Sequence, residues 1–228
     1  MLIARGEERL RALAAETSSE YEVCDVTNRA AVERTAASIR KRHPVLELLV
    51  NNAGVPARAS FLDAEPEVIE EVIRVNYLGG VWCLRAFLPA LEAAGGAHVV
   101  NVVSVAGSIA LPPSGPYAAS KHAQLAFSRA TAGELAGRCI SVHTVSPGFV
   151  ETEGFPQRAF LRNPLLRRAV VEPDRVAERI VQLIERNRRE AFVPGWYRAA
   201  ALAQAAAPGA IGRLFARYGR RHPGGRPR

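Results

Sequence analysis

The chain has 228 residues, 48% of them hydrophobic, and a mean hydropathy of −0.01. These values suit one larger α/β domain with a sizeable core, and they exclude wholesale disorder. No run of about 18 apolar residues predicts a transmembrane helix. The N-terminus becomes charged at Arg5, too early for a signal peptide.

The formal net charge is +8, and arginine supplies nearly all the positive charge because lysine occurs only at positions 41 and 121. No nucleic-acid-reading module accompanies the basic residues, so we expect no nucleic-acid partner. The cysteines Cys24, Cys83 and Cys139 are scattered. They predict buried free thiols in a cytoplasmic protein, with no disulfide framework and no metal site.

Short apolar runs alternate with longer stretches of helical periodicity. The runs predict strands at residues 2–4, 21–24, 46–50, 98–103, 140–145 and 191–193. The periodic stretches predict helices at residues 7–15, 30–42, 67–94, 117–136 and 174–188. This alternation predicts a Rossmann-like, doubly wound parallel sheet with helices on both faces. The nearly continuous runs at 46–50 and 98–103 predict strands buried on both faces.

Ligands of such sheets bind beyond the carboxyl ends of the strands. The segments that follow the predicted strands are rich in Asn, Asp, Ser and Gly. They comprise residues 5–6, 25–26, 51–54, 104–107 and 146–152. We therefore expect the chemistry of the protein at this edge of the sheet.

Tyr117 and Lys121 lie four residues apart at the start of a predicted helix, which places both side chains on one face. Tyrosine ordinarily has a pKa near 10, and lowering it to about 7 requires roughly 4 kcal/mol of preferential stabilisation of the phenolate. A lysine cation and the positive end of the helix both act in that direction. The pair is therefore a candidate proton-transfer site.

Two further side chains could complete this site. Ser104 follows a predicted strand and could donate a hydrogen bond to a developing oxyanion. Asn76 could hold a water molecule that passes protons to Lys121. Singly, each residue has an ordinary structural explanation, such as a helix cap for Ser104 or a buried polar anchor for Asn76.

In their order and spacing, the motifs resemble those of the short-chain dehydrogenase/reductase family over about residues 1–195. The matching motifs are Cys24-Asp25-Val26-Thr27, Asn51-Asn-Ala-Gly54, Val75-Asn76, Ser104-Val-Ala-Gly107, Tyr117-Ala-Ala-Ser-Lys121, and Pro147-Gly148 with Thr152. The resemblance implies an oxidoreductase that interconverts an alcohol and a ketone or aldehyde. It further implies that Ser104, Tyr117 and Lys121 form a catalytic triad, which Asn76 extends to a tetrad.

The same resemblance implies a nicotinamide cofactor. Its predicted contacts are Arg5, Asp25, Val26, Asn52, Ala53, Gly54, Tyr117, Lys121, Pro147, Gly148, Val150 and Thr152. Arg5 stands where NAD enzymes of this kind usually carry an acid. An arginine suits a 2′-phosphate, so we expect NADP rather than NAD.

The chain departs from the family in one respect. No glycine-rich Thr-Gly-x-x-x-Gly-x-Gly turn precedes Asp25, so the first strand–helix unit, which binds the pyrophosphate, is missing. Its absence is expected to leave a gap in the sheet or to force the sheet to close, with weak NADP(H) binding and reduced stability. Either the sequence is a truncated reading of a longer gene, which we favour, or it is a shortened, cofactor-defective relative that acts as a non-catalytic interaction protein.

Two segments bear on the substrate and partners. Apolar residues within 153–172 predict a lid over a small hydrophobic carbonyl or alcohol substrate. Beyond the predicted domain at 1–195, residues 196–228 form a basic helical tail. Residues 197–221 could lie on an anionic membrane surface or pack on a second subunit, since we expect a homo-oligomer.

Overall fold

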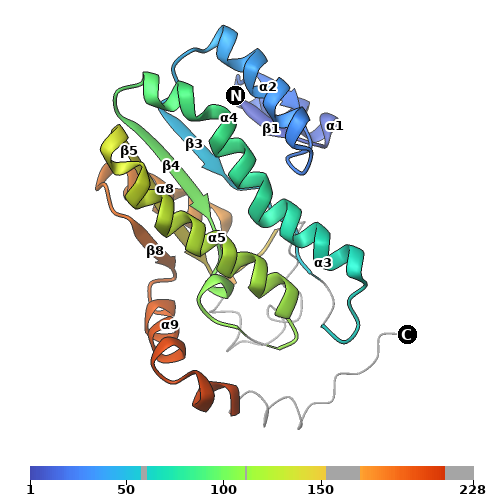
Figure 1. The fold of residues 1–228 in the computed structure, drawn as a ribbon, viewed down its shortest axis with the longest axis vertical. Helices are drawn as coiled ribbons and strands as arrows, with labels where there is room; N and C mark the ends of the chain where they lie inside the picture. The colour runs from blue at the N-terminus through green and yellow to red at the C-terminus, as the bar shows by residue number, and fades with distance from the viewer. Residues whose placement is uncertain (58–60, 111, 153–169, 214–228) are drawn as a thin grey trace.

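The computed structural model describes residues 1–57, 61–110, 112–152 and 170–213 (Figure 1). Its strands are β1 (Leu2–Ala4), β2 (Tyr21–Val23), β3 (Leu48–Asn51), β4 (Ala97–Val102), β5 (Ile140–Pro147), β6 (Phe149–Val150), β7 (Val170–Val171) and β8 (Glu190–Val193). Its α-helices are α1 (Glu7–Glu16), α2 (Arg29–Arg42), α3 (Pro66–Ile73), α4 (Gly79–Ala93), α5 (Gly115–Glu134), α8 (Pro173–Glu185) and α9 (Tyr197–Ala206). The predicted order of strands and helices is confirmed.

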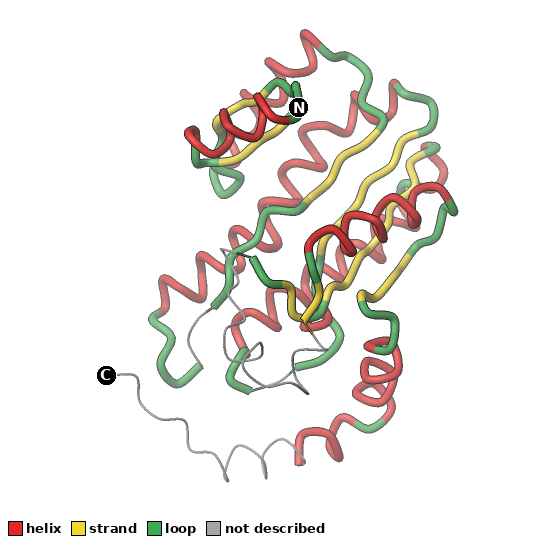
Figure 2. Tube along the Cα trace, turned by 180° about the vertical axis from the view of Figure 1, so that it is seen from behind, coloured by secondary structure: helices red, strands yellow, loops and turns green. Residues whose placement is uncertain are grey.

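All the strand pairs are parallel, as the alternation of strands and helices predicts. The main sheet has the order β3-β4-β5-β8, while β1 pairs with β2 in a separate two-stranded sheet. Figures 1 and 2, which view the molecule from opposite sides, both show the β1–β2 pair standing apart from β3. The sequence predicts either a gap in the sheet or a sheet that closes. In the described residues there is a gap, because β1 and β2 do not pair with β3.

Helices cover both faces of the main sheet. On one face, α4 and α5 pack against β4 and β5 through a buried cluster that includes Leu84, Leu91 and Val99. On the other, α8 packs through Val176 and Leu183 against the opposite sides of β4, β5 and β8. Figure 1 shows α4 and α5 in front of the strands, and Figure 2 shows a helix over the opposite face. The Rossmann-like fold is therefore confirmed.

The N-terminal β1–β2 unit is held by side-chain packing rather than by sheet hydrogen bonds to β3. Ile3 of β1 and Leu49 of β3 pack against the same cluster, formed by α2 and α4 around Ala36, Ile39 and Phe87. Apolar packing of this kind fixes the unit without a continuous backbone ladder.

The prediction that residues 46–50 are buried on both faces is wrong for two side chains. Leu48 is 42% exposed and Val50 is 41% exposed. Strand side chains alternate between faces, and α4 covers the face that carries Leu49, whereas α8 packs over β5 and β8 rather than over β3. Val23 of β2 is similarly open, at 48% exposure.

A chain of buried polar side chains fixes the register of three strands beneath the carboxyl edge. Asn51 Nδ2 donates to Asn101 Oδ1 at 2.9 Å, and Asn101 Nδ2 donates to Ser128 Oγ at 2.9 Å. Ser128 Oγ and Thr144 Oγ1 are 2.7 Å apart. Each of these buried groups has a partner, so the chain ties β3, β4 and β5 to α5 without an unsatisfied polar atom.

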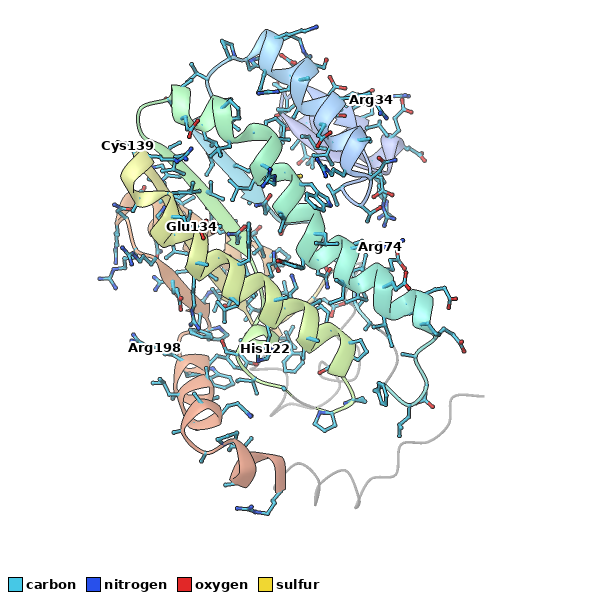
Figure 3. All side chains as sticks on the ribbon, in the orientation of Figure 1. Arg34, Arg74, His122, Glu134, Cys139 and Arg198 are labelled. Atoms are coloured by element: carbon cyan, nitrogen blue, oxygen red, sulfur yellow. The ribbon has the colours of Figure 1, made fainter. Side chains whose placement is uncertain are left out.

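Two details differ from the sequence prediction. The helix predicted at 67–94 is interrupted by a π-helical turn at Arg74–Leu78. Cys24 and Cys83 are buried, but Cys139 is exposed in a turn with φ +57°, at the end of α5 remote from His122 (Figure 3). The expectation of three buried thiols is therefore wrong for Cys139, which lies in a surface connection. No helix in the described part of the chain is both long and apolar enough to span a membrane.

Candidate active site

A cavity of about 750 Å³ lies at the carboxyl edge of the main sheet. Its polar wall is formed by Asn52, Ser104, Ser114, Tyr117, Lys121, Thr152 and Tyr197. Most of its remaining lining is apolar, including Val50, Val102, Val103, Ile109, Val176 and Ile180. Segments that are distant in sequence thus meet where parallel strands are expected to bind ligands.

Ser104 stands directly beyond β4, at the start of a short 3₁₀ turn (Val105–Gly107). Its Oγ accepts a hydrogen bond from the backbone N–H of Ala106 at 3.1 Å. That contact uses the oxygen as an acceptor and leaves the hydroxyl proton free to point elsewhere. A hydrogen bond joins the Ser104 hydroxyl to Tyr117.

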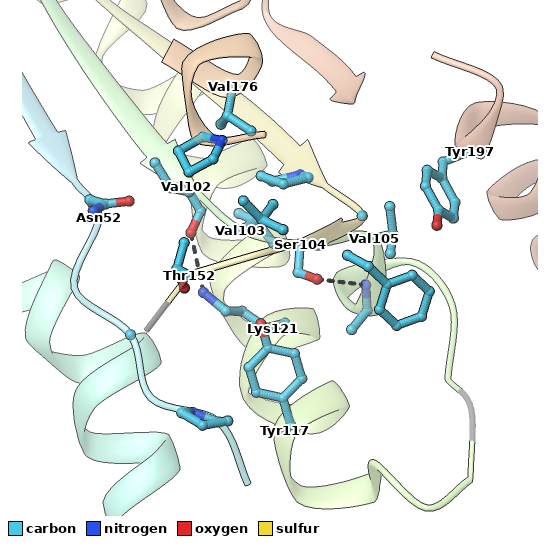
Figure 4. A pocket seen from close by; sticks show the side chains of 18 of the residues that line it. Asn52, Val102, Val103, Ser104, Val105, Tyr117, Lys121, Thr152, Val176 and Tyr197 are labelled. Carbon is cyan, nitrogen blue, oxygen red and sulfur yellow. Dashed lines mark hydrogen bonds between the residues drawn. The ribbon is translucent and has the colours of Figure 1, made fainter. Parts of the chain in front are cut away.

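Tyr117 is placed by the beginning of α5, where Pro116 in the first turn suits a helix start. Lys121, one turn further on, lies with Nζ 6.0 Å from the centroid of the Tyr117 ring. Figure 4 shows Ser104, Tyr117 and Lys121 around the same part of the cavity. The structure therefore brings the three predicted catalytic side chains together.

Lys121 is 3% exposed, and its ammonium group has two neutral partners. Nζ donates to the Val102 carbonyl oxygen at 3.2 Å and to Gln124 Oε1 at 2.8 Å. Burial removes hydration from the charged form and lowers the pKa of Lys121 to about 7. The amine therefore titrates near neutral pH.

The pKa of Tyr117 differs from the sequence expectation. Burial raises it, and the hydrogen bond with Ser104 offsets the rise only in part. Neither cause involves Lys121, so the expected lowering of the Tyr117 pKa by Lys121 is not observed. Tyr117 is thus held in its proton-donating form.

Asn76 lies in the π-helical turn and is almost fully buried. Its Oδ1 accepts from Val55 N at 2.7 Å, while Nδ2 donates to Val55 O at 3.1 Å and to Ser120 Oγ at 3.0 Å. Ser120 in turn donates to the Tyr117 carbonyl at 2.7 Å. The side chain thus joins the loop after β3 to the start of α5, and its role in holding water stays a prediction.

The predicted cofactor residues divide into two groups. Asn52, Gly54, Pro147, Gly148, Val150 and Thr152 line the cavity together with Tyr117 and Lys121. Arg5, Asp25, Val26 and Ala53 are not among the cavity residues. The structure therefore brings the contacts predicted for the nicotinamide to one cavity, together with Asn52 and Gly54, for which the family resemblance implies the adenosine ribose side. It does not bring the other four predicted contacts to this cavity.

The residues outside the cavity have local partners. Arg5 Nη1 lies 4.0 Å from Asp25 Oδ2, and both side chains are about half exposed. Asp25 Oδ1 also accepts from the N–H and hydroxyl of Thr27. Val26 packs so closely on Gly79 that a Cβ there would lie 2.7 Å from Val26 Cγ2. The predicted contact of Val26 with a cofactor therefore coexists with a packing role against α4.

Comparison with known proteins agrees with this geometry. A family model described as short chain dehydrogenase matches residues 1–159. The chain belongs to the short-chain dehydrogenase family. Rat (Rattus norvegicus) 17-beta-hydroxysteroid dehydrogenase 13 is 35% identical over 178 residues, covering 76% of this chain and 57% of the relative. Zebrafish (Danio rerio) dehydrogenase/reductase SDR family member 7B is 36% identical over 163 residues, which cover 67% of this chain and 53% of the relative.

Two solved structures are similar over most of the chain. A gluconate 5-dehydrogenase from Burkholderia cenocepacia, in complex with NADP and tartrate, has a TM-score of 0.75 at 25% identity and covers 87% of this chain and 85% of its own. An actinorhodin polyketide ketoreductase with NADPH has a TM-score of 0.76 at 29% identity, and the match covers 86% of this chain and 85% of the ketoreductase chain. The chain spans little more than half the length of the curated relatives cited above.

Sequence reasoning missed three side chains around this family site. Gln124 accepts from Lys121 Nζ, and Ser120 links Asn76 to Tyr117. Both lie on the helix that carries Tyr117, and the i, i+3 spacing of Lys121 and Gln124 is a signal that could have identified Gln124. Tyr197 lines the cavity from the predicted tail, and no motif marks it.

Gly107 permits the close approach of the Ser104 turn to α5. A Cβ at this position would lie 2.7 Å from Val103 Cγ1 and 2.8 Å from the Lys121 carbonyl oxygen. Because backbone cannot move aside as a side chain can, Gly107→Ala is expected to lower the free energy of unfolding by about 1–3 kcal/mol, measured by urea denaturation.

Gly133→Ala is the matched control for this substitution. Gly133 is exposed within α5, and a Cβ there would meet nothing within 4 Å. Removing a helical glycine is expected to stabilise the protein by roughly 0.5–1 kcal/mol. Equal effects of the two substitutions would contradict the proposed close packing at Gly107.

Proposed function

We propose that this chain carries the proton-transfer site of a nicotinamide-dependent oxidoreductase that interconverts a hydrophobic alcohol and its ketone or aldehyde. The observation that carries the proposal is the convergence of Ser104, Tyr117 and Lys121 on the wall of one largely apolar cavity. Membership in the short-chain dehydrogenase family supports this chemistry.

In the reductive direction, the Tyr117 hydroxyl donates its proton to the carbonyl oxygen while that oxygen gains negative charge. The Ser104 hydroxyl donates a hydrogen bond to the same oxygen and holds it beside Tyr117. In the oxidative direction, the Tyr117 phenolate removes the proton from the alcohol. The positive charge of Lys121, when present, stabilises that phenolate.

A nicotinamide cofactor, when bound, supplies or accepts the hydride in this reaction. The residues of the cavity suit its nicotinamide end. A Cβ on Gly54 would lie 3.7 Å from Lys121 Nζ, so glycine at this position leaves the space beside the amine open. We propose that Lys121 donates to the ribose hydroxyls, that Thr152 and Val150 flank the nicotinamide, and that Arg5 binds a 2′-phosphate, which favours NADP.

The cavity also supports an apolar substrate. Val103, Ile109, Val176 and Ile180 present aliphatic side chains to it. The rat relative is named for a hydroxysteroid substrate. We propose a steroid-sized or similarly lipid-like alcohol or ketone. The predicted lid residues Phe155, Phe160, Leu161, Leu165 and Leu166 lie outside the described residues.

Binding of the cofactor is expected to be weak. Arg5, Asp25 and Val26 lie on a unit that is not hydrogen-bonded to β3 and does not contribute to the cavity. Isothermal titration of the chain with NADPH is expected to give a dissociation constant in the high micromolar range or above. Arg5→Ala should weaken NADPH binding but not NADH binding, with the exposed Arg34→Ala as control; a tight NADPH complex would contradict this prediction.

The proposed function is tested by turnover. NADPH oxidation is followed with steroid and aromatic ketones at millimolar cofactor, so that weak binding does not mask the chemistry. The expected result is product alcohol from the wild type and about 10³-fold slower product formation by Tyr117→Phe. Saturation with NADPH and ketone without any product would reject the enzymatic proposal.

One observation favours a second candidate, a non-catalytic interaction protein. Three apolar strand side chains, Val23, Leu48 and Val50, are each more than 40% exposed. A chain that does not bind NADPH at all would fit this alternative, whereas turnover would exclude it.

We also propose, as separate points, a homo-oligomer and a peripheral membrane contact through residues 197–221. Within this range α9 exposes Leu202 at 62%, and the preceding Trp196 is 55% exposed. Residues 214–221 lie outside the described part of the chain. Sedimentation with anionic liposomes, with and without residues 197–228, distinguishes membrane contact from subunit packing.

A further inference from the structure

Tyr197 is the first residue of α9 and extends its ring into the wall of the cavity. The residue is only 6% exposed, yet its hydroxyl oxygen has no hydrogen-bond partner among the described residues. Figure 4 shows the ring beyond Ser104 and Val105 as seen from Lys121. The cavity thus carries a second phenol besides Tyr117, with an unused donor.

The position of this ring is fixed by packing on both sides. Trp196 stacks on Tyr197 with ring centroids 3.8 Å apart. On the other side the ring lies against Gly148, where a Cβ would lie 2.3 Å from Tyr197 Cε2 and 2.9 Å from its hydroxyl oxygen. The backbone therefore accommodates a large aromatic side chain here only because position 148 is glycine.

An unpaired buried hydroxyl is unfavourable, and a phenylalanine would fill the same space without the penalty. Because buried polar groups are nearly always paired, an unpaired one on a cavity wall suggests a functional role. Burial also raises the pKa of Tyr197, so the phenol stays protonated and can act as a donor. Gln204 carries another buried oxygen without a partner, but it is not among the cavity residues.

We propose that the Tyr197 hydroxyl donates a hydrogen bond to a second oxygen of the substrate, distinct from the reacting carbonyl or alcohol. The preferred substrates are then apolar molecules with oxygen at two positions, such as diketones or hydroxyketones. This inference rests on the proposed function, because it takes the cavity to be the substrate site. Tyr197 acts on specificity, whereas Ser104 and Tyr117 act at the reacting oxygen.

The test compares two ketones that differ by one oxygen, 5α-androstan-17-one and 5α-androstane-3,17-dione. Their binding is measured on wild-type protein and on Tyr197→Phe, both in a Trp82→Phe background. This background leaves Trp196, which stacks on Tyr197, as the only tryptophan, so its fluorescence reports binding without requiring turnover.

Tyr197→Phe is expected to weaken binding of the diketone about tenfold relative to its effect on the monoketone. For each ketone, the dissociation constant of Tyr197→Phe is divided by that of the wild type. Comparing these two ratios cancels differences in solubility and hydrophobicity between the ketones. Tyr21→Phe is the matched control, because it removes a phenol hydroxyl on β2 that accepts a hydrogen bond from Arg11 Nε at 3.4 Å. It should leave the difference between the two ketones unchanged.

Stability provides an independent measurement. Because the described residues offer the hydroxyl no partner, Tyr197→Phe should keep or raise the free energy of unfolding. Destabilisation would mean that the hydroxyl serves the fold, and it would overturn the proposal. The proposal is equally overturned by equal effects on both ketones, by a loss confined to NADPH binding, or by wild-type protein that binds neither ketone.

The proposed oxidoreductase activity and the proposed role of Tyr197 can be rejected separately. If Tyr197→Phe weakens diketone binding selectively but the wild type turns over neither ketone, the proposed oxidoreductase is rejected and the role of Tyr197 in binding is supported. Turnover of both ketones with a ratio that Tyr197→Phe leaves unchanged would support the oxidoreductase and reject the role of Tyr197.

Discussion

Replacement of Tyr117 by phenylalanine is expected to lower kcat by about 10³-fold, because it removes the proton donor and leaves the ring in place. The hydroxyl is joined to Ser104 and stands one helical turn from Lys121, so no other described phenol can take over this position. Steady-state NADPH oxidation with a hydrophobic ketone measures the loss. Binding of the ketone should change by less than about threefold, since the apolar wall is intact.

Tyr77→Phe is the matched control for this prediction. Tyr77 packs edge-on against Phe127, with ring centroids 6.0 Å apart, and is not among the cavity residues. Its hydroxyl should be dispensable for turnover. Comparable losses in Tyr77→Phe and Tyr117→Phe would show that the effect is structural and would remove the catalytic assignment of Tyr117.

The raised pKa of Tyr117 also predicts a difference between the two reaction directions. Ketone reduction needs the protonated phenol of Tyr117. Burial favours this form, because it raises the pKa of Tyr117 above the ordinary value of 10.0. The kcat/KM for ketone reduction should therefore not fall near neutral pH through loss of the Tyr117 proton. Alcohol oxidation needs the phenolate and should accelerate as pH rises. The same pH profile in both directions would contradict this assignment.

Periodicity was sufficient to predict the fold because each element packs one side on the core. The amphipathic stretch at 174–188 corresponds to α8, and the apolar run at 140–145 forms the first six residues of β5. Periodicity does not report local hydrogen-bond geometry, however. The π-helical turn that holds Asn76 therefore lay hidden within an apparently continuous helix.

The candidate site could be predicted where its residues follow strands, because parallel strands bring their carboxyl ends together. Ser104 and Thr152 therefore lie on one cavity, and Lys121 reaches the same cavity from α5. Arg5 follows a strand too, but the β1–β2 unit is attached only by packing, so this rule does not bring Arg5 to the cavity. Tyr197 follows β8 in a segment without any motif, and only the three-dimensional packing against Gly148 reveals it.

Replacement of Lys121 by methionine is expected to lower kcat/KM by about 10²-fold or more, and to change how stability depends on pH. The activity loss follows from its place beside Tyr117 and its proposed hold on the ribose. The sequence offers a matched control, because Lys41, at an exposed position on α2, is the only other lysine. Lys41→Met should leave kcat/KM unchanged.

The stability effect follows from the lowered pKa of Lys121, about 7 in the folded protein against the ordinary value of 10.5. Between these values the unfolded chain binds more protons than the folded one, so the free energy of unfolding of the wild type rises with pH. The contribution of a single group is on the order of 1 kcal/mol per pH unit within this window. Lys121→Met removes it, whereas Lys41→Met retains it.

Urea denaturation from pH 6 to pH 10 measures these slopes, and the difference between variants cancels the titration of the other groups. Lysine labelled with ¹³C at Cε adds a direct measurement, because it gives two signals that the variants assign. One signal should titrate near pH 7. Parallel stability slopes for wild type and Lys121→Met, with both lysines titrating near their ordinary pKa, would mean that the amine is hydrated. The lowering of the Lys121 pKa by burial would then be contradicted.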